Sequence, residues 1–177
     1  GNDGNDFING GAGADTVDGA EGSDTVNGGA DNDLVSGGNG NDSVGGGTGD
    51  DSVNGGFGDD TLSADTGLDT LDGTDGSDNV KTVADVDQTL TDNQVAFAGI
   101  PNDTITLIAI EHAWLSGGAS NNTLDATQFT LGGVTLMGGL GSDTLLGTAF
   151  DDVLSAGITT DGTGLDLMLD SLNITDG

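Results

Sequence analysis

An aliphatic residue recurs every nine positions through the first 81 residues of the chain. Counted from Gly1, this stretch divides without gaps into nine nonapeptides, and position 8 of each is Ile, Val or Leu. Positions 7 and 9 are mainly polar, which predicts a very short strand over positions 7–9 with only position 8 facing inward. Positions 1–6 are rich in Gly, Asn and Asp and predict a turn. Two nonapeptides then make one coil of a parallel solenoid with two facing aliphatic columns.

An aspartate precedes the aliphatic residue by two positions in every repeat. The position-6 aspartates are Asp6, Asp15, Asp24, Asp33, Asp42, Asp51, Asp60, Asp69 and Asp78. Because repeats n and n+2 stack on one edge of the solenoid, we expect their carboxylates to converge on the same gap. A solvated turn would favour aspartate but would not hold it in constant phase with a core residue. Calcium prefers roughly six to eight carboxylate and carbonyl oxygens, so the pattern predicts calcium-stapled turns.

The charge balance strengthens the case for a bound cation. The chain has one Lys or Arg against 31 acidic residues, a net charge of −30, and only Glu21 and Glu111 are glutamates. One aliphatic side chain per nonapeptide makes a thin core, and the many glycines lose the most backbone freedom on ordering. Stacked carboxylates add repulsion. We therefore expect the repeat block to be unfolded without a divalent cation, so that binding energy becomes folding energy.

The same composition argues against several partners. Phosphate binding needs Lys and Arg, so neither nucleic acid nor an anionic membrane is expected to bind. No apolar run approaches the roughly 20 residues of a membrane span, so no membrane insertion is expected. Cysteine is absent, which leaves no disulfide framework. The chain opens inside the repeat frame, and we expect it to be a segment of a longer protein. Its partners are then calcium ions and neighbouring domains.

The consensus of the nine repeats, G-G-x-G-x-D-x-U-x with U a large aliphatic residue, resembles the RTX (repeats-in-toxin) hemolysin-type nonapeptide. The resemblance covers residues 1–81 without a gap. It returns at 138–146 (GGLGSDTLL) and, weakened, at 147–155 (GTAFDDVLS). It implies an all-β fold, a right-handed parallel β-roll or β-solenoid with calcium-binding turns. It also implies Ca²⁺ as cofactor, with about seven ions in the main block, because nine repeats form seven n/n+2 pairs.

In that family, each ion is held by the position-6 aspartates of two stacked turns and by four backbone carbonyls. The lower turn supplies the carbonyls of positions 2 and 4, and the upper turn those of positions 1 and 3. The lower carbonyls implied here are those of Asn2, Gly4, Gly11, Gly13, Ala20, Gly22, Gly29, Asp31, Gly38, Gly40, Gly47, Gly49, Gly56 and Gly58. The upper carbonyls implied are those of Gly19, Glu21, Gly28, Ala30, Gly37, Asn39, Gly46, Thr48, Gly55, Phe57, Ala64, Thr66, Gly73 and Asp75.

Departures from the consensus affect some of these sites. Asp31 stands at position 4, and its turn is expected to survive because aspartate tolerates left-handed backbone. Repeat 8 begins with Ala64–Asp65 instead of two glycines and has Leu68 at position 5, which predicts the weakest sites. Thr74 at position 2 and Lys81 at position 9 mark the expected end of the array.

Three parts are expected along the chain. Residues 1–81 form the calcium-binding β-roll, 82–137 an irregular β-solenoid extension, and 138–177 a short second repeat block with a cap. In the second block, Asp143 and Asp152 stand at position 6 and imply a smaller calcium cluster.

Strand-like alternation predicts further strands outside the repeats, without calcium loops. These strands fall at 88–92, 94–98 and 104–110, with an amphipathic capping strand at 165–174. Residues 117–125 regain the nonapeptide with Asn122 in place of aspartate, which predicts a metal-free coil. Residues 126–137 are expected to form a longer turn.

These features predict a non-catalytic, calcium-binding structural module of a large secreted or cell-surface bacterial protein. The family resemblance implies export in the unfolded state by type I secretion, followed by calcium-dependent folding outside the cell. No constellation for acid–base catalysis is found. His112 is the only histidine, and Trp114 is interpreted as a core or cap residue. Pairs such as Asp50–Asp51 are expected to point apart, because the first aspartate stands at position 5.

Two alternatives stay open. Position 7 carries hydroxyl groups in most repeats and predicts two outward ladders, which would suit an adhesin module that binds ice or polysaccharide. The ladders consist of Thr25, Ser43 and Thr61 on one side, and of Thr16, Ser52 and Thr70, interrupted by Leu34, on the other. The ordinary preference of Thr for exposed strand positions explains the same pattern. The second alternative is an accessory module of a secreted enzyme.

Overall fold

The computed structural model describes residues 1–155 and 171–173, and strands are the only regular elements in these ranges. None of the described residues belongs to a helix long and apolar enough to cross a membrane. The chain divides into two compact units. The first comprises Gly1–Lys81 and Asn102–Glu111, and the second comprises Thr82–Pro101 and His112–Gly177. The three-part division expected from the sequence stays a prediction.

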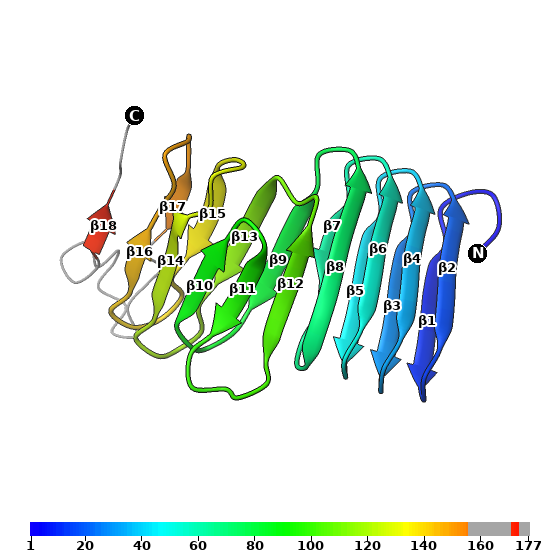
Figure 1. Cartoon of the computed structure of the whole chain (residues 1–177), viewed down its shortest axis with the longest axis horizontal. Helices are drawn as coiled ribbons and strands as arrows, with labels where there is room; N and C mark the ends of the chain where they lie inside the picture. Colours follow the sequence, from blue (N-terminus) through cyan, green and yellow to red (C-terminus); the bar gives the residue numbers. More distant parts are fainter. Residues whose placement is uncertain (156–170, 174–177) are drawn as a thin grey trace. The chain divides into compact units, whose positions relative to one another are not determined.

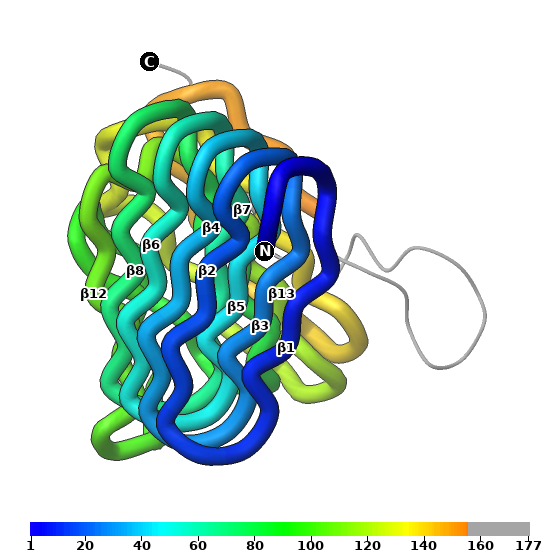
Figure 2. Tube along the Cα trace, turned by 90° about the vertical axis from the view of Figure 1, so that its right-hand side faces the viewer, coloured from blue at the N-terminus to red at the C-terminus, as the bar shows by residue number. Residues whose placement is uncertain are grey.

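In the first unit, odd- and even-numbered strands form two parallel sheets, and successive coils superpose (Figures 1 and 2). The odd strands are β1 (Phe7–Ala12), β3 (Thr25–Ala30), β5 (Ser43–Thr48), β7 (Thr61–Ser63) and the beginning of β9 (Asn79–Val83). The even strands are β2 (Thr16–Glu21), β4 (Leu34–Asn39), β6 (Ser52–Phe57) and β8 (Leu68–Asp75), followed by β12 (Thr104–Ile108). The all-β parallel β-solenoid predicted from the repeats is confirmed.

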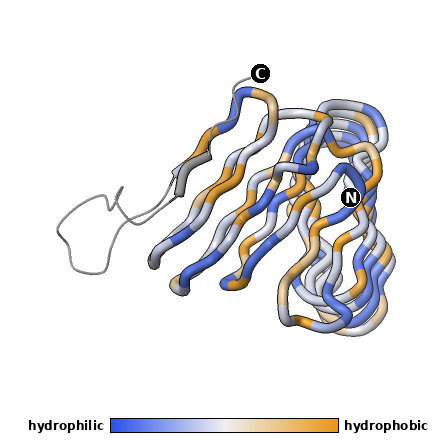
Figure 3. The backbone as a smooth tube through the Cα atoms, turned by 60° about the vertical axis from the view of Figure 1, so that its left-hand side comes forward, coloured by the Kyte–Doolittle hydropathy of each residue, from blue (hydrophilic) through white to orange (hydrophobic). Residues whose placement is uncertain are grey.

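The core of this unit is the pair of aliphatic columns at position 8. Val26 pairs with Val44 and Val44 with Leu62 in the parallel register of the odd sheet, and all three are buried. The even sheet stacks Val17, Val35, Val53 and Leu71 in the same way. Short hydrophobic stretches are separated by neutral and hydrophilic ones along the chain (Figure 3). Register is fixed because a shift of one residue would expose the whole column.

The strands are longer than the repeat pattern predicts. Most of them run over six residues, from position 7 through position 3 of the next repeat. In β3 both Val26 and the position-1 residue Gly28 face inward and are buried. The prediction of three-residue strands with only position 8 inside was therefore wrong. A parallel ladder uses only backbone groups, so glycine-rich positions continue it once neighbouring coils are aligned.

The second unit is a less regular solenoid. Its strands are β10 (Gln88–Thr91), β11 (Gln94–Phe97), β13 (His112–Ser116), β14 (Thr123–Gln128), β15 (Val134–Met137), β16 (Thr144–Leu146), β17 (Val153–Ser155) and β18 (Ser171–Asn173). Strands β13, β15 and β17 pair in parallel, as do β10, β14, β16 and β18. The pair β10–β11 is an antiparallel hairpin.

The predicted strands outside the repeats are confirmed to within a few residues at β10, β11 and β12. The expected turn at 126–137 was wrong in part, because β14 and β15 occupy both of its ends. The predicted capping strand at 165–174 lies outside the described residues except for Ser171–Asn173, which form β18.

Candidate metal centre

The position-6 aspartates form two hydrogen-bonded columns, one on each edge of the first unit. The backbone N–H of each aspartate donates to Oδ1 of the aspartate 18 residues later, at 2.7–2.9 Å. One column runs through Asp6, Asp24, Asp42, Asp60 and Asp78, and the other through Asp15, Asp33, Asp51 and Asp69. Repeats n and n+2 therefore stack on one edge, as the sequence predicts.

The second oxygen of these carboxylates is buried and accepts no hydrogen bond. This holds for Oδ2 of Asp15, Asp24, Asp33, Asp42, Asp51, Asp60, Asp69 and Asp78. From Asp24 onward the side chains are at most 4 % exposed. A buried carboxylate oxygen with neither water nor a donor is strongly destabilising. A cation would satisfy it, and calcium is a hard ion that takes carboxylate oxygens readily. At the first turn, Asp6 Oδ2 instead accepts the N–H of Asn2 at 2.9 Å.

Glycine at position 1, present in every repeat but the eighth, lets Oδ2 and a backbone carbonyl approach each other closely. At Gly37, a Cβ would lie 2.5 Å from Asp42 Oδ2 and 2.6 Å from the carbonyl oxygen of Gly55. Gly28 shows the same arrangement. A carboxylate oxygen and the position-1 carbonyl of the next coil, two of the implied ligands, therefore come together in one space. Any larger residue at position 1 would fill that space.

Three residues other than glycine keep the left-handed backbone of the turn. Ala20 and Thr74 at position 2 have φ of +83° and +78°, and Asp31 at position 4 has φ of +74°. The turn at Asp31 survives, as predicted. A β-branched residue in this region costs about 1–3 kcal/mol, so stacking rather than residue preference sets the turn at Thr74. The left-handed backbone at positions 2 and 4 is thus present in repeat 9.

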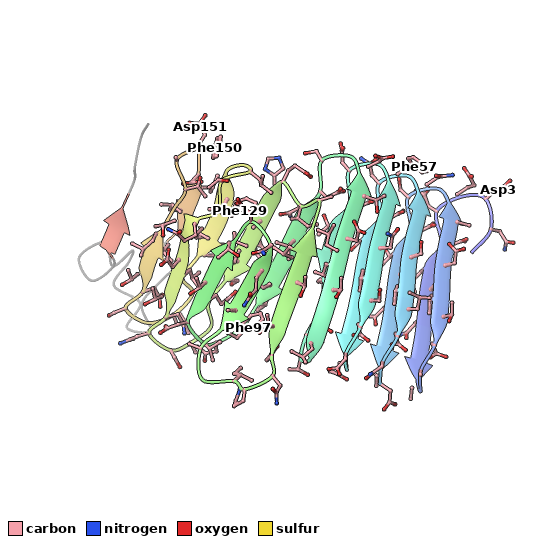
Figure 4. All side chains as sticks on the ribbon, in the orientation of Figure 1. Asp3, Phe57, Phe97, Phe129, Phe150 and Asp151 are labelled. Atoms are coloured by element: carbon pink, nitrogen blue, oxygen red, sulfur yellow. The ribbon has the colours of Figure 1, made fainter. Side chains whose placement is uncertain are left out.

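The implied position-3 ligands act through the backbone, which explains why their side chains vary. Phe57 lies at the end of β6 with its ring 61 % exposed (Figure 4). Its carbonyl accepts the N–H of Gly40 at 2.7 Å and retains a second lone pair. In residues 1–155 and 171–173, no three His, Cys, Asp or Glu side chains are grouped so as to hold a metal. The candidate sites instead combine carboxylates with backbone carbonyls.

The family model of the RTX calcium-binding nonapeptide repeat matches residues 1–26, 11–44, 18–53, 45–80 and 137–161. The chain belongs to the RTX calcium-binding nonapeptide repeat family. No curated relative matches it. RTX repeats bind calcium and are typical of secreted bacterial proteins, and the β-roll is a structural module rather than a catalytic fold.

RTX turns in this chain contain a second ladder that the sequence reasoning missed. Position-5 side chains accept the position-5 N–H of the repeat 18 residues later, at 3.0–3.3 Å. The accepting residues are Asn5, Ser23, Asn32, Asn41, Asp50 and Asp59. The available clue was that position 5 is mostly Asn, Asp or Ser, short side chains that readily accept from nearby backbone.

Burial raises the pKa of five RTX column aspartates, all in repeats 5–9. The pKa of Asp60 and of Asp69 rises from 3.8 to about 6, first because burial removes water and further because neighbouring carboxylates repel. The N–H that donates to each carboxylate opposes this rise. The pKa of Asp42, Asp51 and Asp78 is raised for the same leading reason. Without a cation, the columns therefore hold their charge at a cost in free energy.

Repeat 8 departs from the other RTX turns in structure as well as in sequence. Strand β7 stops at Ser63, three positions earlier than the other strands of the block. Ala64 carries a methyl group at the position where a Cβ elsewhere would meet the aspartate Oδ2. Asp65 lacks the left-handed φ of position 2, and its N–H donates to the carbonyl of Gly47 at 3.0 Å. The prediction that its sites are the weakest remains to be measured.

The two position-6 aspartates of the second RTX block differ from each other: Asp152 is hydrogen-bonded at both oxygens, whereas Asp143 is buried and accepts a backbone N–H at Oδ1, as the column aspartates do. Asp152 accepts hydrogen bonds at both oxygens, from backbone N–H groups and from the Thr148 hydroxyl, at 2.7–2.9 Å. Asp143 Oδ1 accepts the N–H of Asn122 at 2.8 Å. Asn122 in turn accepts the N–H of Gly118 at 3.1 Å, so that coil closes without a carboxylate. Calcium at Asp143 and Asp152 stays a prediction.

The remaining candidates lie on exposed or partly exposed strand positions. His112 is exposed, with Nδ1 3.4 Å from the carbonyl oxygen of Gly133. Trp114 is half-buried on β13. The hydroxyl ladder of the odd sheet is in register, with Thr25 paired to Ser43 and Ser43 to Thr61. The ladder of the even sheet is interrupted by Leu34, which is 53 % exposed.

Proposed function

We propose that this RTX chain is a calcium-dependent folding module of a large secreted or cell-surface bacterial protein. The observation that carries the proposal is the set of eight buried Oδ2 atoms without hydrogen bonds, arranged in two columns. Such atoms oppose folding when they bear charge and favour it when a shared cation neutralises them.

About seven ions follow from the seven n/n+2 pairs of the nine repeats. One ion lies between two stacked turns and takes both aspartates together with the carbonyls of positions 2 and 4 below and of positions 1 and 3 above. The site of repeats 3 and 5, for example, combines Asp24 and Asp42 with the carbonyls of Ala20, Gly22, Gly37 and Asn39. Each ion converts repulsion between coils into attraction, which supplements the thin aliphatic core.

Calcium dependence suits a protein that must leave the cell before it folds. Inside the cell calcium is scarce, the columns repel, and the chain stays extended enough for a type I secretion channel. Outside, calcium closes the turns. The module then acts as a structural element beside neighbouring domains of a longer parent chain, without nucleic acid or membrane insertion.

Far-ultraviolet circular dichroism of the 177-residue chain during calcium titration tests this proposal. We expect a gain of β-structure with calcium. Magnesium should be less effective, because it demands octahedral geometry and dehydrates reluctantly. Asp42→Asn should weaken the calcium response by roughly tenfold or more, because the column loses a charge. The matched control is Asp18→Asn, an exposed position-9 residue outside the columns. A β-roll spectrum that persists in excess chelator would overturn the proposal.

A further inference from the structure

The last coil of the repeat block is completed by a segment outside the repeats. Residues Asn102–Glu111 belong to the same compact unit as Gly1–Lys81. Within this segment, Glu111 Oε2 accepts the N–H of Asp78 at 3.0 Å, and the N–H of Glu111 donates to the carbonyl of Asp78 at 3.1 Å. The earlier links of this column join aspartates 18 residues apart, whereas its last link joins Asp78 to a glutamate 33 residues away.

Glu111 reproduces the contacts that two consecutive residues make within the repeats. Asp78 Oδ1 accepts the N–H of Asp60 at 2.8 Å, and the N–H of Asn79 donates to the Asp60 carbonyl at 2.9 Å. The backbone of Glu111 therefore stands where a position-7 residue stands, and its carboxylate reaches back to the position-6 place. The extra methylene of glutamate provides that reach. Only Glu21 and Glu111 are glutamates in a chain of 31 acidic residues.

Ala109 supplies the carbonyl that a position-1 glycine supplies elsewhere. A Cβ on Gly73 would meet both Asp78 Oδ2 and the carbonyl oxygen of Ala109. At Gly37 the corresponding atoms are Asp42 Oδ2 and the carbonyl oxygen of Gly55. The same oxygen-lined space is thus rebuilt at the end of the column by a segment with no nonapeptide frame. Ala109 has a φ of +49°, a left-handed conformation that Ala rarely adopts.

The lower half of the site is already in place. Asp78 is 0 % exposed, and its Oδ2 accepts no hydrogen bond. Thr74 and Gly76, at positions 2 and 4 of repeat 9, have φ of +78° and +151°, the left-handed turn of the other repeats. Their carbonyls would serve as the lower ligands of one further ion, beyond the seven that repeat pairs alone provide.

We infer that Asp78, Glu111 and the Ala109 carbonyl form an additional calcium site, with the carbonyls of Thr74 and Gly76, at the C-terminal end of this column. Two carboxylates and several carbonyls are the donor set that calcium takes. The ion ties the Asn102–Glu111 segment to the repeat block. This inference rests on the proposed calcium-binding function and extends it to residues outside the nonapeptides.

The test counts calcium ions per chain by native mass spectrometry and by calorimetric titration, for wild type and variants of the full 177-residue chain. Glu111→Gln keeps an oxygen for the Asp78 N–H but removes the charge. Glu111→Asp keeps the charge but lacks the reach. We expect each variant to bind about one ion fewer than wild type while still gaining β-structure with calcium. The control is Asp72→Asn, which also removes a charge near Asp78 but lies outside the site.

The outcomes separate the two proposals. If wild type binds no calcium, the proposed function fails. If wild type binds calcium and either glutamate variant keeps the full number of ions, the additional site is overturned, even when the variant is less stable. If Asp72→Asn loses an ion as well, general loss of charge explains the result, and the additional site is likewise overturned.

Discussion

Asp50 and Asp51 are adjacent in sequence, yet their carboxylates accept hydrogen bonds from coils on opposite sides of their own. Asp50 Oδ1 accepts the N–H of Leu68 in the following coil at 3.0 Å, whereas Asp51 Oδ1 accepts the N–H of Asp33 in the preceding coil at 2.9 Å. The expectation that such pairs point apart is thus met. Each turn of this type is hydrogen-bonded to both the following and the preceding coil through the Oδ1 atoms of positions 5 and 6. The Oδ2 atom of position 6 takes no part in these bonds and is available to a cation.

Replacing Gly37 with Ala should disable one turn. The new Cβ would lie 2.5 Å from Asp42 Oδ2 and 2.6 Å from the Gly55 carbonyl oxygen, in the space where the ligands converge. We expect a loss of at least about 1–3 kcal/mol in the unfolding free energy of the calcium-loaded protein, as for other overpacked sites. We also expect weaker calcium binding, measured by calorimetric titration.

The matched control is Gly45→Ala, because the nearest atom to its new Cβ is Ser63 Oγ at 3.4 Å, an ordinary contact. This variant should be neutral or more stable by about 0.5–1 kcal/mol. Equal effects of the two substitutions would show that the position-1 space has no special role.

Acid should stabilise the metal-free roll. The pKa of Asp60 and Asp69 in the folded state is about 6, above the ordinary 3.8. The folded state therefore binds more protons than the unfolded state between these values. The contribution to stability is fully present below about pH 4 and is lost as pH rises through about 6. Circular dichroism in calcium-free buffer measures the effect: the chain is expected to be unfolded at neutral pH and to gain β-structure as the pH falls through this range.

Calcium should reverse this pH dependence, because it competes with protons for the same oxygens and binds more tightly as pH rises. A metal-free roll that gains stability between about pH 4 and 6 would contradict the assignment of buried, cation-seeking aspartates to the columns.

Replacing Asn41 with Ala should destabilise the roll without changing its ion count. Its side chain accepts the N–H of Asp59 at 3.2 Å, and position 5 is no ligand in the proposed sites. We expect a loss of about 0.5–1.5 kcal/mol in unfolding free energy. Asn27→Ala, at an exposed position 9, should stay within about 0.5 kcal/mol of wild type. Loss of an ion in Asn41→Ala would show that position 5 takes part in binding.

The sequence allows the two aspartate columns to be predicted, but neither the length of the strands nor the residue that ends the column at Asp78. The nine-residue period places an aspartate at position 6 and an aliphatic residue at position 8 of every repeat, as at Asp42 and Val44. The stacking of the aspartates and the burial of the aliphatic residues follow directly from this period. The six-residue strands were missed because glycine has low strand propensity, and only the alignment of neighbouring coils keeps positions 1–3 in the ladder. The role of Glu111 was missed for a different reason. It depends on a hydrogen bond to Asp78, 33 residues earlier in the chain, which a local sequence pattern does not predict.

The antiparallel hairpin in the second unit illustrates the same limit. Alternation places strands near Gln88–Thr91 and Gln94–Phe97, and a short polar turn joins them. Alternation alone does not state whether two strands pair with each other or with a later coil. That choice depends on partners such as β14, whose Leu124 pairs with Gln88.

The direction of the column hydrogen bonds makes the two ends of the roll chemically unlike. At position 6 the N–H groups face higher residue numbers and the carboxylates face lower ones, whereas position-5 acceptors such as Asp50 face higher ones. At position 6, a coil therefore presents a donor to the next coil and an acceptor to the preceding one, and successive coils match only when they are stacked in the same direction.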